Sequence, residues 1–166
     1  MEPRKRDFIQ IVESNQGIIK SLCKAYYLSC DDQKDAFQDI VLQLWKSFGT
    51  FRGESKVSTW IYSVSLNTIL TKVRNEKRKI ITESISSEQT FSHAMADDDS
   101  ELLKMVLQLL SGLDKAIVIL YLEGYKNKEI SDLLNLTPTN VSTRLNRVKG
   151  VLKAKFKNHH YEFKQP

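Results

Sequence analysis

The sequence predicts an all-α protein made of two small helical domains joined by a flexible acidic linker, the C-terminal one a helix-turn-helix. Its 166 residues include only 6 Gly and 3 Pro, too few turn-forming positions for a many-stranded sandwich or barrel. Apolar residues recur mostly three and four positions apart, which is the period of an α-helix. The 41% share of hydrophobic residues is enough to bury a core.

The charge distribution suggests where the two domains meet. Residues 1–79 carry a net charge of +5, residues 80–112 of −5, and residues 113–166 of +5. The acidic segment is rich in Ser and Asp and has weak apolar periodicity, as expected of a solvated linker. We therefore expect a first domain at residues 1–80, a linker at 81–100 and a second domain at 101–166. The alternative is a long loop within one domain, which is uncommon in compact folds.

The first domain begins with two amphipathic segments. In the first, Phe8 to Tyr26, the apolar period is interrupted near Gly17, which leaves open one long helix or two. Asp31 or Asp32 is suited to cap the next helix. Its apolar stripe follows the i, i+3, i+4 rule closely and consists of Phe37, Ile40, Val41, Leu44, Trp45 and Phe48.

The opposite face of this second helix is acidic and amide-rich. It carries Asp35, Gln38, Asp39 and Gln43 at offsets of three and four. Such a strip could dock a basic partner surface. Spacing alone favours the simpler reading of an ordinary solvated helix face.

A short polar turn, residues 51–56, leads into a third helix that Ser58 or Thr59 is suited to cap. Aromatic rings near the turn can stack on unpaired bases, hydroxyls and Asn67 can bond base edges, and the basic end of the helix can hold phosphates. The rings are Phe51, Trp60 and Tyr62, and the cations are Lys72, Arg74, Lys77 and Arg78. This combination favours single-stranded nucleic acid. The alternative is that Trp60 and Ile61 belong to the core and the basic run is a solvated helix end.

The second domain contains a stripe from Leu102 to Leu110 and then a strongly apolar segment, residues 113–122, too short to cross a membrane. Two short helices follow, Asn127 to Leu134 and one beginning at Pro138. Thr137 is a good N-cap, Pro138 suits the first helical position, and Asn135 tolerates the left-handed conformation that the turn requires. These features are typical of a helix-turn-helix.

The last helix buries Val141, Leu145, Val148 and Leu152, spaced by four, three and four. Short polar side chains near its start can enter a major groove while the cations beyond them grip the DNA backbone. The side chains on this face include Thr139, Asn140, Ser142, Thr143, Arg144, Arg147 and Lys149. The alternative is a basic amphipathic helix for a membrane or protein partner.

Other function classes lack their motifs. No apolar stretch reaches the roughly 20 residues of a membrane span and no hydrophobic signal segment follows the N-terminus, so we expect a cytoplasmic protein without membrane insertion. Cys23 and Cys30 lack CxxC spacing, and three consecutive aspartates, residues 97–99, point in different directions. No nucleophile, base and orienter set and no Gly-rich phosphate loop are present. We expect no cofactor, no metal and no catalytic activity.

The motifs in this order resemble the extracytoplasmic-function class of bacterial RNA polymerase sigma factors, in the sigma-70 superfamily. Residues 35–45, DAFQDIVLQLW, resemble the family's core-polymerase-binding helix. Residues 51–55 (FRGES), 58–62 (STWIY) and Asn67 resemble its promoter-melting segment. Residues 113–125, Glu129-Ile130 and 141–145 (VSTRL) resemble its promoter-reading helix-turn-helix. The resemblance covers nearly the whole chain.

The resemblance implies a transcription initiation factor that binds core RNA polymerase and promoter DNA; the family often has an anti-sigma factor as well. It implies polymerase contacts by Asp35, Gln38, Asp39, Leu42 and Trp45. It implies capture of a flipped minus-ten base by the loop from Phe51 to Thr59 with Asn67. The residues it implies in minus-ten DNA binding are Phe51, Arg52, Ser58, Thr59, Trp60, Tyr62, Asn67, Lys72 and Arg74. It implies minus-thirty-five contacts by Thr139, Asn140, Ser142, Thr143, Arg144, Arg147 and Lys149.

Three serines depart from the family pattern. Many relatives carry a basic residue in place of Ser63 and alanines in place of Ser65 and Ser131. The last two put polar groups near expected packing positions.

Two other functions remain possible from the sequence: a stand-alone helix-turn-helix regulator, which would bind duplex tightly without polymerase, and a metal-dependent nuclease using Asp35 and Asp39.

Overall fold

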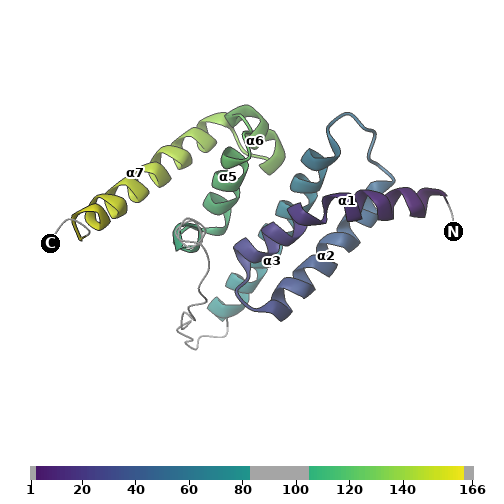
Figure 1. The fold of residues 1–166 in the computed structure, drawn as a ribbon, viewed down its shortest axis with the longest axis horizontal. Coiled ribbons are helices and arrows are strands. Elements are labelled where there is room, and N and C mark those ends of the chain that lie inside the picture. The colour runs from purple at the N-terminus through teal and green to yellow at the C-terminus, as the bar shows by residue number, and fades with distance from the viewer. Residues whose placement is uncertain (1–2, 83–104, 163–166) are drawn as a thin grey trace. The chain divides into compact units, whose positions relative to one another are not determined.

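The computed structural model describes residues 3–82 and 105–162, and every regular element in these ranges is a helix. Contacts divide the chain into two units on either side of residues 95–96. The N-terminal unit contains α1 (Pro3–Tyr26), α2 (Cys30–Phe48) and α3 (Val57–Thr82), and the C-terminal unit contains α5 (Gly112–Leu122), α6 (Asn127–Leu134) and α7 (Pro138–Glu162) (Figure 1). The all-α prediction is confirmed. Most of the predicted linker lies outside the described residues, although α3 takes its first two positions.

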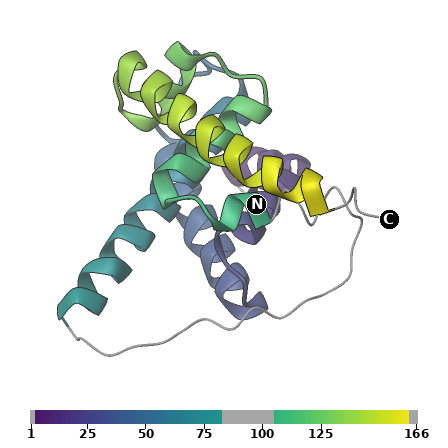
Figure 2. The same ribbon diagram turned by 90° about the vertical axis from the view of Figure 1, so that its left-hand side faces the viewer.

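In the N-terminal unit the three helices pack against one another around a shared apolar core. Phe8, Ile19 and Leu22 of α1 are buried, and so are Ile40 and Leu44 of α2. Because the buried side chains of α1 lie on both sides of Gly17, one continuous helix buries more apolar surface than two, which offsets the roughly 1 kcal/mol that a helical glycine costs. The open choice is thus settled as one helix. Beyond this core the C-terminal turns of α3 diverge from α2 (Figure 2).

Two predicted helix N-caps are wrong by two or three residues. Helix α2 is capped by Ser29, whose hydroxyl oxygen accepts from the backbone N–H groups of Asp31 and Asp32 at 3.2 and 3.4 Å. The two aspartates therefore lie in the first turn, where the helix dipole favours negative charge. Ser58 and Thr59 are likewise inside the first turn of α3, which begins at Val57.

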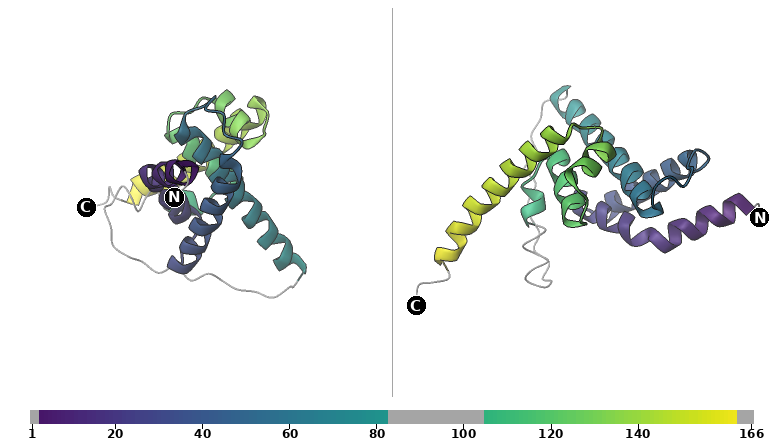
Figure 3. Two further views of the ribbon diagram at one scale, coloured as in Figure 1. Left: turned by 90° about the vertical axis from the view of Figure 1, so that its right-hand side faces the viewer. Right: turned by 90° about the horizontal axis from the view of Figure 1, so that it is seen from above.

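The C-terminal unit has the predicted helix-turn-helix, with α6 occupying the predicted residues. Asn135 adopts the left-handed conformation (φ 53°, ψ 47°), and the backbone N–H of Leu136 donates to the carbonyl of Ser131 at 2.9 Å. The Thr137 hydroxyl accepts from the Asn140 N–H at 3.2 Å, so it caps α7 as predicted. Val141, Leu145 and Val148 are buried. The C-terminal half of α7 projects beyond α5 and α6 (Figures 1 and 3).

Ser65 is a buried polar group whose hydroxyl has no hydrogen-bond partner. We expect Ser65→Ala to raise the free energy of unfolding of the N-terminal unit by about 1 kcal/mol, because it removes an unsatisfied buried hydroxyl and alanine is the better helix former. Denaturant unfolding measures this, followed by tryptophan fluorescence for the N-terminal unit and by far-UV circular dichroism for both units. Ser131→Ala is the matched control, since the Ser131 hydroxyl donates to the Lys128 carbonyl at 2.6 Å and its removal should bring no gain. Equal stabilisation by both would contradict the assignment.

No helix in residues 3–82 and 105–162 combines the length and the apolar character needed to span a bilayer.

Candidate nucleic-acid interface

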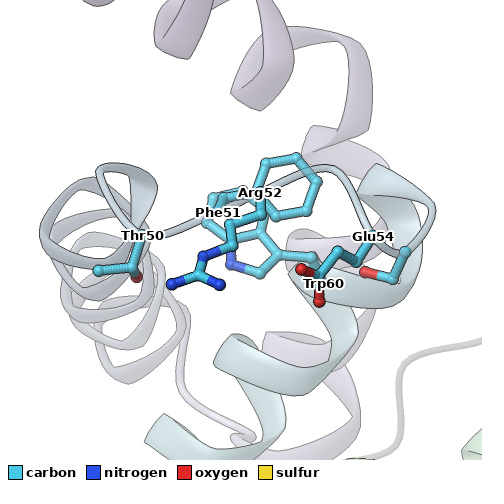
Figure 4. Close-up of a pocket in the computed structure, with 6 residues that line it drawn as sticks. Thr50, Phe51, Arg52, Glu54 and Trp60 are labelled. Carbon is cyan, nitrogen blue, oxygen red and sulfur yellow. The ribbon is translucent and has the colours of Figure 1, made fainter.

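The loop between α2 and α3 forms a pocket of about 450 Å³ in the N-terminal unit. It is lined by Thr50, Phe51, Arg52, Glu54, Ser55 and Trp60. The Phe51 and Trp60 rings are stacked, with centroids 4.8 Å apart and planes 30° from parallel. Figure 4 shows the Arg52 guanidinium and the Glu54 carboxylate on opposite sides of these rings. The pocket therefore offers a flat aromatic surface, a cationic donor and an anionic acceptor, which suits an unpaired base.

The pocket is tied to the core through a chain of aromatic rings. The ring centroids of Trp60 and Phe48 are 6.3 Å apart, and those of Phe48 and Phe8 are 5.4 Å apart. The Phe8 ring meets the Trp45 ring edge-on, with centroids 5.0 Å apart. Trp60 is half-buried, and its ring both packs inward against Phe48 and lines the pocket. Gly53, in the middle of the loop, has a φ of +72°, a conformation that costs other residues about 1 kcal/mol or more.

Tyr62 does not belong to this surface. Its side chain is only 7% exposed, because position 62 of α3 faces the other helices. The expectation that its ring stacks on a base is therefore wrong. Ser58, Thr59 and Asn67 are half-buried on α3, and the Asn67 amide donates to the Ser63 hydroxyl at 3.5 Å. None of the three lines the pocket.

The basic residues predicted on α3 have different surroundings. Lys72 pairs with Asp39 of α2 at 2.9 Å and lies 5.9 Å from the centre of the Tyr27 ring. The hydrogen bond to Asp39 raises the pKa of Lys72 above its ordinary value, so this side chain is charged at neutral pH. Arg74 is exposed. The structure thus joins one residue expected on DNA to one expected on polymerase.

The predicted polymerase-binding residues share one exposed face of α2. Asp35, Gln38 and Asp39 are exposed, and two large apolar side chains continue the face, Leu42 at 49% and Trp45 at 41% exposure. An acidic strip beside exposed apolar side chains is a surface that fits a basic protein partner with an apolar patch.

In the C-terminal unit the polar start of α7 is open to solvent. Thr139, Asn140 and Thr143 are exposed. Ser142 is not, since its half-buried hydroxyl accepts from the Asn127 amide of α6 at 2.9 Å. Its hydroxyl thus braces the helix-turn-helix, contrary to its predicted place on DNA.

Three predicted DNA-binding cations of α7 contact α5 instead of standing free. Arg144 and Arg147 each donate to a different carboxylate oxygen of Asp114, both at 2.8 Å. Lys149 lies 4.6 Å from the centre of the Tyr121 ring and donates to its hydroxyl at 3.3 Å. Arg147 is still 60% exposed and Arg144 29%. We call Ser111, Asp114, Asn140, Arg144 and Arg147 the arginine cluster.

Asp114 is the centre of this cluster, with 9% of its side chain exposed. Burial acts to raise its pKa, but hydrogen bonds from Arg144 and Ser111 and the charge of the two arginines outweigh burial and lower the pKa below its ordinary value. The carboxylate is therefore ionised at neutral pH, and its two oxygens receive three hydrogen bonds.

Sequence reasoning missed several residues at both places. Thr50 lines the pocket although it precedes the loop to which the resemblance pointed. Glu54 and Ser55 lie in that loop, residues 51–59, but were not singled out as site residues. Asp114 had a partial signal, because Ser111 and Asp114 are spaced as in a capping box before an apolar run. The Ser111 hydroxyl does accept from the Asp114 N–H at 3.2 Å. That spacing predicts a helix start and says nothing of arginines on another helix.

Known proteins match both units in the same order along the chain. Residues 11–79 match the family model for sigma-70 region 2, and residues 100–151 match that for sigma-70 region 4. The ECF RNA polymerase sigma-E factor of Haemophilus influenzae is 25% identical over 167 residues, covering 91% of this chain and 88% of the relative. The ECF RNA polymerase sigma factor SigW of Bacillus subtilis is 22% identical over 170 residues, covering 91% and 89%.

One solved structure has the same fold. It is the co-crystal structure of the sigma factor RpoE in complex with the anti-sigma factor NepR from Bartonella quintana. The match has a TM-score of 0.75 at 18% sequence identity, over 92% of this chain and 98% of the matched chain.

Proposed function

The chain belongs to the extracytoplasmic-function class of the sigma-70 family, and on this basis we propose that it is a transcription initiation factor that binds core RNA polymerase and directs it to specific promoters. One observation carries the proposal. A single chain combines a unit whose loop pocket fits an unpaired base with a unit whose helix-turn-helix fits paired DNA. In a stand-alone regulator the first unit would sense a signal or dimerise, and it would need no pocket for an unpaired base.

In this function the N-terminal unit, residues 1–80, melts the minus-ten element. Extruding a base costs a few kcal/mol of lost stacking, and capture of that base in a pocket offsets the cost. Phe51 and Trp60 supply the stacking surface and Arg52 a cationic donor. Arg74, exposed near the end of α3, is available to a backbone phosphate.

The C-terminal unit, residues 101–166, reads the minus-thirty-five element as duplex. Thr139, Asn140 and Thr143 lie in the first turns of α7, the part of a recognition helix that meets base edges. Arg147 and Lys149 are exposed beyond them and can contact phosphates.

Partners, location and chemistry follow from this role. Core polymerase binds the exposed face of α2, and an anti-sigma factor is a further candidate partner, as the Bartonella complex contains one. We place the protein in the cytoplasm and assign it no catalytic activity of its own.

Run-off transcription with purified core polymerase and a promoter library tests the function. Transcripts that depend on this chain support it. Tight duplex binding without initiation would favour the stand-alone regulator instead.

Replacing Asp39 with lysine is expected to weaken binding to core polymerase roughly tenfold, because it reverses a charge in the centre of the docking face. Fluorescence anisotropy with labelled protein measures the affinity. Lys72→Gln is the matched control, since it breaks the same Asp39–Lys72 pair and leaves the carboxylate in place. If both variants weaken binding equally, the effect comes from the lost pair and Asp39 does not belong to the docking face.

A further inference from the structure

The arginine cluster contains a contact that links a buried charge to a base-reading side chain. Arg144 donates from Nη1 to Asp114 at 2.8 Å, and from Nε to the Oδ1 atom of Asn140 at 2.8 Å. A guanidinium is planar, so fixing its Nη1 edge on one acceptor also fixes the direction of its Nε–H. Asp114 therefore sets the direction in which Arg144 holds Asn140.

This contact orients the Asn140 amide. Its oxygen accepts from Arg144, one turn further along α7, so its NH₂ group points away from that contact and offers two donors. Asn140 is exposed and lies in the first turn of α7, where its N–H donates to the Thr137 cap. The amide NH₂ donors of Asn140 therefore lie at the start of the recognition helix.

Arg144 itself has little freedom to read a base. Its side chain is 29% exposed and already serves two acceptors. Arg147 is 60% exposed, and its hydrogen bond within residues 3–82 and 105–162 goes to Asp114. Two arginines on one carboxylate leave the cluster with a net charge of +1, and the exposed Arg147 carries it toward solvent.

We propose that Asp114 is a positioning residue for promoter recognition, which acts through Arg144 to orient the Asn140 amide toward a purine in the minus-thirty-five element. Both purines present an N7 acceptor in the major groove, which an amide NH₂ can bind. This proposal rests on the proposed function and deepens it. It makes Arg144 an orienting side chain rather than a base reader.

Base preference at each minus-thirty-five position tests the proposal. Run-off transcription is measured with holoenzyme carrying the full chain and promoters that differ at single positions. Asn140→Ala first identifies the position that it reads, by loss of a purine preference there. Arg144→Gln and Asp114→Ala are expected to lose the preference at that same position, roughly tenfold, and to keep it elsewhere.

Two control variants separate orientation from stability. Arg147→Gln removes the other arginine from the same carboxylate and leaves the Asp114–Arg144–Asn140 contacts in place. It should lower activity equally on all promoters, through its lost phosphate contact, and keep the purine preference. Val148→Ala removes buried methyl groups from α7 and should lower activity equally on all promoters. Circular dichroism melts show which variants fold. Should Asp114→Ala not fold, the comparison of Arg144→Gln with Arg147→Gln decides.

Three outcomes would overturn the proposal. The preference at the Asn140 position could survive in Arg144→Gln. Arg144→Gln could instead lose base preference at a different position from Asn140→Ala, which would make Arg144 itself a base reader. Arg144→Gln and Asp114→Ala could both lower activity equally on all promoters, as Val148→Ala is expected to do. If the wild-type chain initiates from no promoter, the proposed function itself is refuted. This result is obtained before any variant is compared.

Discussion

Replacing Asp114 with alanine is expected to lower the free energy of unfolding of the C-terminal unit by about 2 kcal/mol. Removing one partner from a buried ion pair costs roughly 3–5 kcal/mol, because the other charge is left uncompensated. The cost is smaller here since Arg147 is 60% exposed and can turn into water. Arg144, at 29% exposure, cannot do so without leaving Asn140.

The two units can be monitored separately. Both tryptophans of the chain, Trp45 and Trp60, lie in the N-terminal unit, so their fluorescence follows that unit alone, while far-UV circular dichroism follows both. Asp114→Ala should shift only the transition that fluorescence does not detect. Asp132→Ala removes an exposed carboxylate of α6 and should change stability by less than about 0.5 kcal/mol. Equal effects of the two substitutions would show that the arginine cluster contributes nothing.

The same effect should depend on pH. The pKa of Asp114 is lowered by its arginine and serine partners, so its stabilising contribution is complete above the ordinary aspartate pKa of roughly 3.9 and is lost as the pH falls through the folded-state value. We therefore expect the stability difference between the wild type and Asp114→Ala to be constant near neutral pH. It should shrink below about pH 4.

Replacing Phe51 with alanine is expected to reduce promoter opening by the holoenzyme roughly 30-fold. Stacking of an unpaired base on an aromatic ring contributes roughly 1–3 kcal/mol. The Phe51 ring lines the pocket and is stacked on the Trp60 ring. The ring lies on a loop and is half-buried, so its loss should affect the fold less than the loss of Trp60. Permanganate reactivity of thymines in the minus-ten region measures the opening.

Phe48→Leu is the matched control for Phe51→Ala. Phe48 contacts the Trp60 ring at 6.3 Å but does not line the pocket. It should lower the stability of the N-terminal unit and leave opening of folded holoenzyme unchanged. Wild-type opening by Phe51→Ala would remove the pocket from the melting mechanism.

Local pattern in the sequence was enough to predict the all-α fold and the helix-turn-helix. Apolar spacing identifies the buried face of a helix from its own residues, as at Val141, Leu145 and Val148. Turn chemistry is equally local, so Asn135 and Thr137 could be assigned to the left-handed turn and the N-cap before any fold was known. The acidic strip of α2 followed from the same periodicity, but periodicity placed Trp45 in the apolar stripe, whereas its side chain is 41% exposed.

The contacts of the functional side chains could not be predicted in this way, because they depend on how the helices pack. Helical spacing does not reveal which residue a neighbouring helix presents, and Asp114 lies 30 positions from Arg144. A long cationic side chain can extend into water or reach a carboxylate, and packing brought Arg144 and Lys72 to Asp114 and Asp39. The aromatic ring of Tyr62 was buried for the same reason. Burial and pairing depend on groups distant in the chain, so local pattern cannot determine them.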